Sequence, residues 1–160
     1  MESNALIDAY LDGAKRLRDG VAGLSPQEVK LRPIPGKWST LEVVCHLADF
    51  EIVFADRIKR VIAEDEPPLP SGDENLFAAR LAYHDRDLES ELSLVDALRK
   101  HLAVILRTLK PEDYQRRGIH SEAGPITLET LVQRATGHIA HHLKFIAEKK
   151  RAIHAHHASP

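Results

Sequence analysis

Ten of the 160 residues are histidine, and two of them, His138 and His142, are spaced so that they can act together. A separation of four residues places both imidazoles on one face of a helix, about 6 Å apart along its axis. Imidazole is the commonest metal ligand in proteins, and two such rings on one helix can bind one divalent ion. The pair alone does not establish a metal site, because helices carry histidines at this spacing for other reasons too.

A metal site needs a third ligand, and His46 is the candidate. Three histidines leave a fourth tetrahedral position open, as in catalytic zinc sites. However, His46 shares its helix face with a mostly charged set of residues, namely Glu42, Asp49, Val53 and Arg57. Periodicity by itself therefore favours a solvated histidine on a polar stripe. The metal interpretation requires this stripe to border a groove between helices, where Asp49 or Glu42 could hold a ligand or a bound water.

The other side chains with reactive chemistry are expected to lie outside this site. Cys45 points about 100° away from His46 around the helix, so a buried core position is expected for it. His141 is displaced from the face of the pair and is expected at its rim. The last three histidines belong to a terminal tail that we expect to fray: His154, His156 and His157. Nothing distinguishes the remaining three from ordinary surface or loop residues: His84, His101 and His120.

Several familiar active-site motifs are absent from the sequence. It contains neither the G-x-x-x-x-G-K-[ST] phosphate loop nor the G-x-G-x-x-G dinucleotide motif, and it also lacks G-x-S-x-G. The histidine pair reads His138-Ile139-Ala140-His141-His142, with no glutamate after the first histidine. The general base of thermolysin-type enzymes is therefore not supplied at this place.

Four long segments have the periodicity of amphipathic helices: about 5–24, 39–64, 88–109 and 127–153. No segment alternates with period two for long enough to predict a strand. Four helices of about 20 residues suit an all-α four-helix bundle. The connection between the second and third helices is long, which predicts a crossover instead of a tight hairpin.

The second helix has a clear start. Ser39 and Glu42 form a capping box, and three prolines between positions 67 and 70 end the helix. Trp38, just before the cap, can act as a hydrophobic staple or as the wall of a pocket. Thr127 is the predicted N-cap of the fourth helix.

Length and composition indicate one domain, expected over 1–153 with a flexible tail over 154–160. Lys plus Arg number 22 and Asp plus Glu number 24, and this balance argues against a nucleic-acid partner. No apolar stretch is long enough for a membrane helix, and the N-terminus has no signal-peptide pattern. The single cysteine, Cys45, cannot form an internal disulfide, which predicts a reducing, cytoplasmic environment. The lack of a membrane helix predicts that there is no membrane partner.

Two distant motifs resemble those of the DinB-like (YfiT-like) metalloenzyme family. The first comprises Pro35-Gly36-Lys37-Trp38-Ser39 and Val43-Val44-Cys45-His46-Leu47-Ala48-Asp49. The second comprises Ile126-Thr127-Leu128-Glu129 and Gly137-His138-Ile139-Ala140-His141-His142. The turns at 24–28 and 109–113 match as well, so the resemblance covers about residues 5–150.

The resemblance implies a four-helix bundle in up-down-down-up order with a long crossover. It also implies that His46, His138 and His142 bind a divalent ion, zinc or nickel, which reverses the interpretation of His46 from periodicity. Asp49 matches a recurrent position of the family, and its role in orienting a ligand or handling a proton is our own inference. Family members often form homodimers, and we expect one here.

Characterised members of the family include thiol S-transferases that use bacillithiol, glutathione or mycothiol, and a mycothiol-dependent isomerase. Our first hypothesis is therefore a metal-dependent S-transferase that joins a low-molecular-weight thiol to a small electrophile, with a metal-activated thiol or water as nucleophile. A metal-dependent hydrolase on the same site is the first alternative, and a thiol requirement separates the two. A non-enzymatic metal-binding or dimeric module is the second alternative, and it predicts no turnover.

Overall fold

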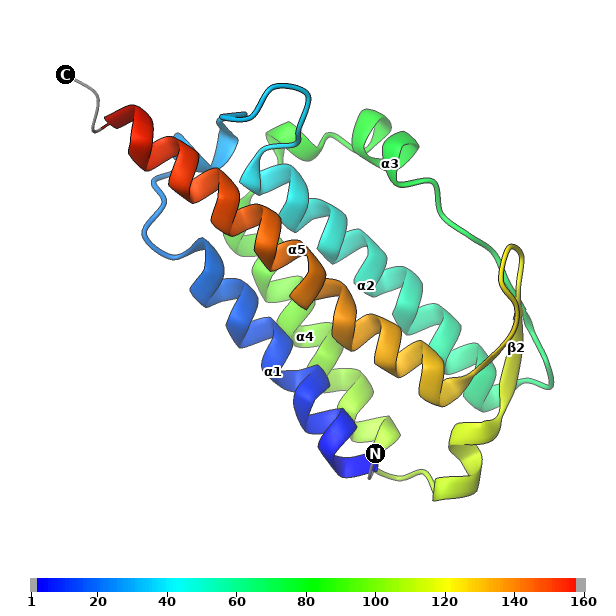
Figure 1. The fold of residues 1–160 in the computed structure, drawn as a ribbon. Helices are drawn as coiled ribbons and strands as arrows, with labels where there is room; N and C mark the ends of the chain where they lie inside the picture. The colour runs from blue at the N-terminus through cyan, green and yellow to red at the C-terminus, as the bar shows by residue number, and fades with distance from the viewer. Residues whose placement is uncertain (1–2, 158–160) are drawn as a thin grey trace.

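The computed structural model describes residues 3–157 as four long helices with a small sheet at one end (Figure 1). The long helices are α1 (Ser3–Val21), α2 (Thr40–Ala63), α4 (Leu88–Leu106) and α5 (Leu128–His157). Helices α1 and α5 run in one direction and α2 and α4 in the other, so the order is up-down-down-up. Helices α1 and α2 each pack against both α4 and α5. The structure thus confirms the predicted four-helix bundle.

The ends of the helices follow the local sequence. At the start of α2, the Glu42 backbone N–H donates to Ser39 Oγ at 3.1 Å, and the Ser39 N–H donates to the Glu42 carboxylate at 2.7 Å. This is the predicted capping box. Helices α1 and α4 end a few residues earlier than predicted, at Val21 and Leu106.

Helix α5 is longer than predicted, because it continues past Ile153 to His157. No glycine or proline interrupts residues 153–157, and Ile153 is buried, so the end predicted at Ile153 was too early. Of the predicted flexible tail 154–160, residues 158–160 lie outside the described structure, as do the side chains of His156 and His157.

The connection between α2 and α4 is the predicted long crossover. It contains the short strand β1 (Pro68–Leu69), helix α3 (Glu74–Arg80) and the 3-10 turn η2 (Tyr83–Asp85). Two further 3-10 turns, η1 (Glu28–Lys30) and η3 (Pro111–Gln115), lie in the other connections. The crossover packs on α2 through α3 and η2, and so it covers the face of α2 that carries His46.

A three-stranded sheet lies at the end of the bundle, and the sequence analysis missed it. Strand β1 pairs in parallel with β2 (Arg117–His120), which pairs in antiparallel fashion with β3 (Gly124–Thr127). This hairpin lies between the third and fourth predicted helices, where no strand was expected. Strands of two and four residues are too short to produce a recognisable alternation in the sequence, which is why the pattern gave no signal.

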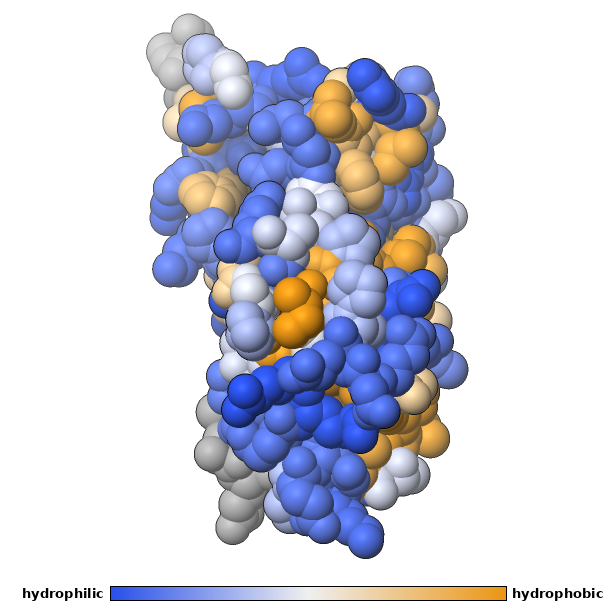
Figure 2. Space-filling view, turned by 90° about the vertical axis from the view of Figure 1, so that its right-hand side faces the viewer, coloured by the Kyte–Doolittle hydropathy of each residue, from blue (hydrophilic) through white to orange (hydrophobic). Residues whose placement is uncertain are grey.

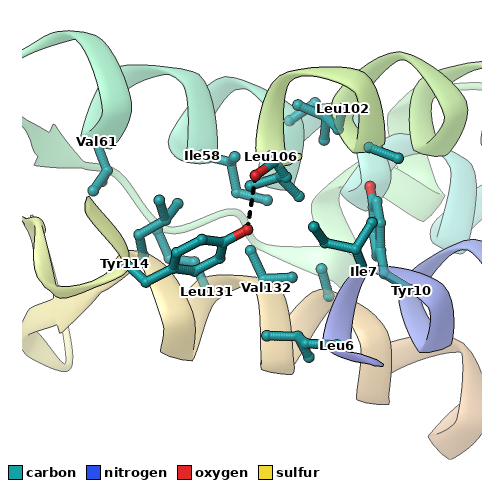
Figure 3. Packing of buried hydrophobic residues seen from close by; sticks show 14 of the residues in the cluster. Leu6, Ile7, Tyr10, Ile58, Val61, Leu102, Leu106, Tyr114, Leu131 and Val132 are labelled. Atoms are coloured by element: carbon teal, nitrogen blue, oxygen red, sulfur yellow. Dashed lines mark hydrogen bonds between the residues drawn. The ribbon is translucent and has the colours of Figure 1, made fainter. Parts of the chain in front are cut away.

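The core beneath the sheet joins all four long helices. Tyr114 of η3 inserts among aliphatic side chains, and its hydroxyl donates to the Leu106 carbonyl at 2.9 Å (Figure 3). The other labelled residues of this cluster are Leu6, Ile7, Tyr10, Ile58, Val61, Leu102, Leu131 and Val132. Their burial supplies much of the apolar surface that stabilises the bundle.

A buried ion pair crosses the middle of the bundle. Arg99 of α4 and Glu51 of α2 are 0 % and 1 % exposed, and Arg99 Nε and Nη2 lie 3.0 and 2.8 Å from Glu51 Oε2. The Tyr10 hydroxyl donates to Glu51 Oε1 at 2.8 Å. Arg99 also donates to the backbone carbonyls of Tyr10 on α1, at 2.6 Å, and Ala135 on α5, at 2.8 Å. One side chain thus contacts all three other long helices.

Replacing one partner of this pair should be costly. We expect Glu51→Gln to lower the free energy of unfolding by about 3–5 kcal/mol, because the substitution leaves the Arg99 charge buried without its counter-charge. The measurement is urea denaturation. The control is Lys100→Met, which removes an exposed pair with Asp96 and should have a much smaller effect. Equal effects of the two substitutions would contradict the assigned role.

Candidate metal centre

The three predicted histidines converge between α2 and α5. His46 comes from α2, and His138 and His142 lie one turn apart on α5. Their ring centroids are 4.9 Å (His46–His138), 4.7 Å (His46–His142) and 4.8 Å (His138–His142) apart. One nitrogen of each ring lies within 4.8 Å of the others. In the described part of the chain no other trio of histidine, cysteine or carboxylate side chains gathers in this way.

The spacing of the nitrogens fits a single metal ion. Zinc–nitrogen bonds are about 2.0–2.1 Å long, so two imidazole nitrogens on one tetrahedral ion lie about 3.3 Å apart. The Nε2 atoms of His46 and His138 are 3.0 Å apart. The Nδ1 atoms of all three rings are buried and find no hydrogen-bond partner among the described residues. Apart from the contact between the two Nε2 atoms, no hydrogen bond among the described residues occupies these rings.

The electrostatics of the site also suit metal binding. Burial lowers the pKa of His46 to about 4, against a smaller opposing effect of the Asp49 charge. Burial is the main cause that lowers the pKa of His138 to about 3, and the charges of the neighbouring His46 and His142 lower it further. Burial is also the main cause that lowers the pKa of His142 to about 4, with smaller contributions from the charges of His46 and His141. All three rings are neutral near pH 7, and neutral imidazole is the form that binds metals.

Aromatic side chains surround the three histidines. Phe50 lies one turn beyond His46 on α2, with ring centroids 4.6 Å apart, and Trp38 lies 5.3 Å from His46 on the other side. Phe54 lies 5.8 Å from the His138 ring. The sequence analysis missed Phe50 and Phe54, although their spacing of four and eight residues from His46 was the signal that could have identified them.

A pocket of about 450 Å³ opens beside His142. Trp38, Val43 and Phe145 contribute apolar surface to it, so Trp38 is a pocket wall, one of its two predicted roles. The polar side chains that line the pocket are Lys37, Glu74, Asn75, Glu148 and Lys149. A concave space that combines apolar walls with polar side chains beside a ligand set can hold a small molecule.

The charged stripe beside His46 is not solvated, and the prediction from periodicity was wrong on this point. His46, Glu42 and Asp49 are 1 %, 4 % and 8 % exposed. Arg32 pairs with Glu42, and Arg86 pairs with Asp49. These arginines come from the segment before α2 and from the crossover, so the periodicity of α2 alone could not show that its polar face is covered.

Asp49 is held away from the histidines by its own ion pair. Arg86 Nη1 lies 3.0 Å from both Asp49 oxygens, and Arg86 also donates to Glu91. No hydrogen bond in the described structure joins Asp49 to the three histidines. Its predicted part in orienting a ligand or handling a proton stays a prediction.

The remaining candidates lie where the sequence placed them. Cys45 is fully buried, with its Sγ 3.4 Å from the Tyr83 carbonyl, and burial raises the pKa of its thiol to about 12. It is a core residue and not a ligand. His141 is exposed at the rim, with its ring centroid 5.1 Å from that of His142.

The sequence of this chain matches a known protein family and several of its members. The model of the DinB superfamily matches residues 9–146. The chain belongs to the DinB superfamily. Among its relatives, OB0782 of Oceanobacillus iheyensis is 31 % identical over 143 residues, which cover 89 % of this chain and 83 % of that protein. YfiT of Bacillus subtilis is 26 % identical over 139 residues, with coverage of 86 % and 78 %. Both relatives carry the name "putative metal-dependent hydrolase".

Solved structures of other proteins share the DinB-superfamily fold. The structure of YfiT, described as an unusual four-helix bundle, matches with a TM-score of 0.87 and 24 % identity, covering 95 % of this chain and 87 % of YfiT. A mycothiol-dependent maleylpyruvate isomerase matches with a TM-score of 0.72 and 11 % identity, covering 89 % and 60 %. These matches show that the overall fold of this chain is shared with both proteins.

Metal content tests the three ligands directly. In a background where His154, His156 and His157 are replaced by alanine, we expect about one equivalent of zinc or nickel per chain after desalting, because three neutral imidazoles converge. His46→Ala should lose this metal, and His101→Ala, at an exposed position on α4, should keep it. Elemental analysis is the measurement, and undiminished metal in His46→Ala would contradict the assignment.

The metal-free protein should lose stability as the pH falls from about 6.5 to about 4. Unfolded histidines take up protons near their ordinary pKa of about 6.5, whereas the folded ones have pKa values of about 3 to about 4. The unfolded state therefore binds more protons in this window, and so the free energy of unfolding decreases as the pH is lowered.

His138→Gln removes one such group, so its free energy of unfolding should depend less on pH. Urea denaturation at about pH 7.5 and about pH 5 measures the change, with His101→Gln as the control. An unchanged pH dependence in His138→Gln would show that His138 is not held neutral.

Proposed function

We propose that this protein is a divalent-metal-dependent enzyme in which His46, His138 and His142 hold zinc or nickel. The observation that carries the proposal is the convergence of three neutral imidazoles beside a pocket of about 450 Å³. Structural zinc sites use four protein ligands, whereas catalytic sites use three and keep one position open. With three histidines and an adjacent space, this centre matches the catalytic class.

A low-molecular-weight thiol is the nucleophile we propose, acting on a small electrophile. A divalent ion held here lowers the pKa of a bound thiol or water and so supplies a nucleophile near neutral pH. A thiol, with a pKa of about 8.5, needs less activation than water. Asp49 lies three residues after His46 on α2, and both of its carboxylate oxygens accept from Arg86 at 3.0 Å. The mycothiol dependence of the isomerase with this fold is compatible with the choice.

The protein's own residues have distinct tasks in this proposal. The three histidines stay neutral because they are buried, and so they remain ligands near pH 7. Trp38 and Phe145 form the apolar wall against which an electrophile packs. Asp49 is a positioning residue, because its charge, fixed by Arg86, acts on His46 without a direct hydrogen bond.

Hydrolysis at the same centre is the second candidate. Relatives are named metal-dependent hydrolases, and the exposed carboxylates of Glu74 and Glu148 line the pocket, where one of them can accept a proton from water. A thiol requirement separates the two reactions. The third hypothesis, a metal-binding module without catalysis, predicts bound metal and no turnover in either assay.

The homodimer implied by the family resemblance stays a prediction, which light scattering after size-exclusion chromatography tests. On the face shown in Figure 2, apolar side chains form separate patches divided by hydrophilic surface. That face does not present one continuous apolar interface.

Along residues 3–157, no helix combines the length and the apolar character needed to cross a membrane.

Thiol transfer should be detectable with a model reaction. With zinc or nickel bound, we expect the protein to accelerate thioether formation between a small thiol and 1-chloro-2,4-dinitrobenzene, measured by absorbance. His142→Ala should reduce this rate by at least about a hundredfold, because it removes a metal ligand beside the pocket. His101→Ala is the matched control and should retain the full rate.

Two outcomes decide against the assignment. Full activity in His142→Ala would contradict a role for the metal centre. Ester hydrolysis that needs the metal but no thiol, together with no thioether formation, would replace thiol transfer by hydrolysis.

A further inference from the structure

Lys149 is a buried cation in the pocket beside the metal centre. It is 4 % exposed and lines the same pocket as His142. Its Nζ donates to the Phe145 carbonyl at 3.4 Å, a long hydrogen bond within α5. An ammonium group has three donors, and within residues 3–157 no carboxylate forms an ion pair with this one. The metal-centre chemistry proposed above leaves Lys149 without a task.

The burial of this charge is unfavourable unless something compensates for it. Burial is the main cause that lowers the pKa of Lys149, and the charge of Glu148 opposes it only in part. The carboxylates around it have other surroundings: Glu42 is paired with Arg32, while Glu74 and Glu148 are exposed. The missing counter-charge is therefore one that a ligand can bring.

The position of Lys149 relates it to the metal centre. It follows His142 by seven residues, so both side chains lie on one face of α5, about 10 Å apart along the axis. Side chains on a helix lean toward the N-terminus, and Nζ accordingly reaches back to the Phe145 carbonyl, one turn closer to His142. Trp38 and Phe145 line the same pocket and offer apolar surface near both groups.

We propose that this pocket selects small organic anions, with a carboxylate on Lys149 and the reactive end of the molecule toward the three histidines. The other charged side chains that line the pocket, Lys37, Glu74 and Glu148, are exposed and balanced by solvent, so Lys149 is the buried charge that a ligand meets. The substrate class rests on the proposed function of the metal centre, whereas the anion site rests on Lys149 alone. The carboxylate can belong either to the thiol or to its acceptor.

The test compares three probes on the zinc-loaded protein by isothermal titration calorimetry: 3-mercaptopropionate, its methyl ester and butyrate. We expect the acid to bind at least about tenfold more tightly than the ester, because only the acid can pair with the buried ammonium. Lys149→Met should remove this preference and leave the affinity for the ester unchanged. Lys149→Arg should retain part of the preference.

The matched control is Lys144→Met, which removes an exposed lysine from the same helix and should preserve the preference. Equal affinity of the wild-type protein for the acid and the ester overturns the anion site without recourse to any variant. Equal weakening of both ligands by Lys149→Met also overturns it. Butyrate binding is also measured on the metal-free protein. If the affinity for butyrate still depends on Lys149 there, the carboxylate does not bind by coordinating zinc.

The probes separate this inference from the proposed function. Equal binding of the acid and the ester, with thiol-dependent turnover, overturns the anion site and leaves the thiol transferase. Lys149-dependent binding of butyrate, with no turnover of any thiol, leaves the anion site and overturns thiol transfer. If butyrate still binds when the methyl ester of 3-mercaptopropionate saturates the protein, the carboxylate belongs to the acceptor. If only 3-mercaptopropionate shows the preference over its ester and butyrate does not bind, the carboxylate belongs to the thiol.

Discussion

The buried pair of Arg99 and Glu51 is the interaction on which the geometry of the bundle depends. Glu51 lies five residues beyond His46 on α2, and Ala135, whose carbonyl accepts from Arg99, lies three residues before His138 on α5. The network therefore fixes the two metal-binding helices next to the places where their histidines meet. Gly13 on α1 makes room for it, because a Cβ there would lie 2.2 Å from Arg99 Nη1.

Charge pairing on α2 distinguishes structural residues from functional ones. Each carboxylate on its covered side has an arginine from another segment: Glu42 has Arg32, Asp49 has Arg86 and Glu51 has Arg99. Buried polar groups normally find such partners. The three histidine rings and Lys149 have no carboxylate partner among the described residues, and His142 and Lys149 line the same pocket. A metal ion can complete the histidine rings, and an anionic ligand can complete Lys149.

The parts of the structure that depend on local periodicity were predictable from the sequence. The four long helices, the capping box at Ser39 and the face shared by His138 and His142 all follow from spacing along one helix. The burial of His46 does not, because it depends on the crossover and on two arginines distant in sequence. For that residue the family resemblance was informative where periodicity was misleading.

Features built from short or distant segments could not be predicted in the same way. The strands pair over two to four residues, too few for an alternating pattern. Lys149 looks like any lysine of a surface helix until the pocket around Trp38 and Phe145 is assembled. Helix α5 continues to His157 because nothing in its last turn stops it, so three of the crowded C-terminal histidines extend a helix and lie beyond the metal centre.

The most direct test of a three-histidine centre with one open position is X-ray absorption spectroscopy of the zinc-loaded protein. It should show three imidazole nitrogens and one further light atom at about 2.0–2.1 Å, and an added thiol should replace that atom by sulfur at about 2.3 Å. Fewer than three imidazoles, or four protein ligands that no thiol displaces, would contradict the account.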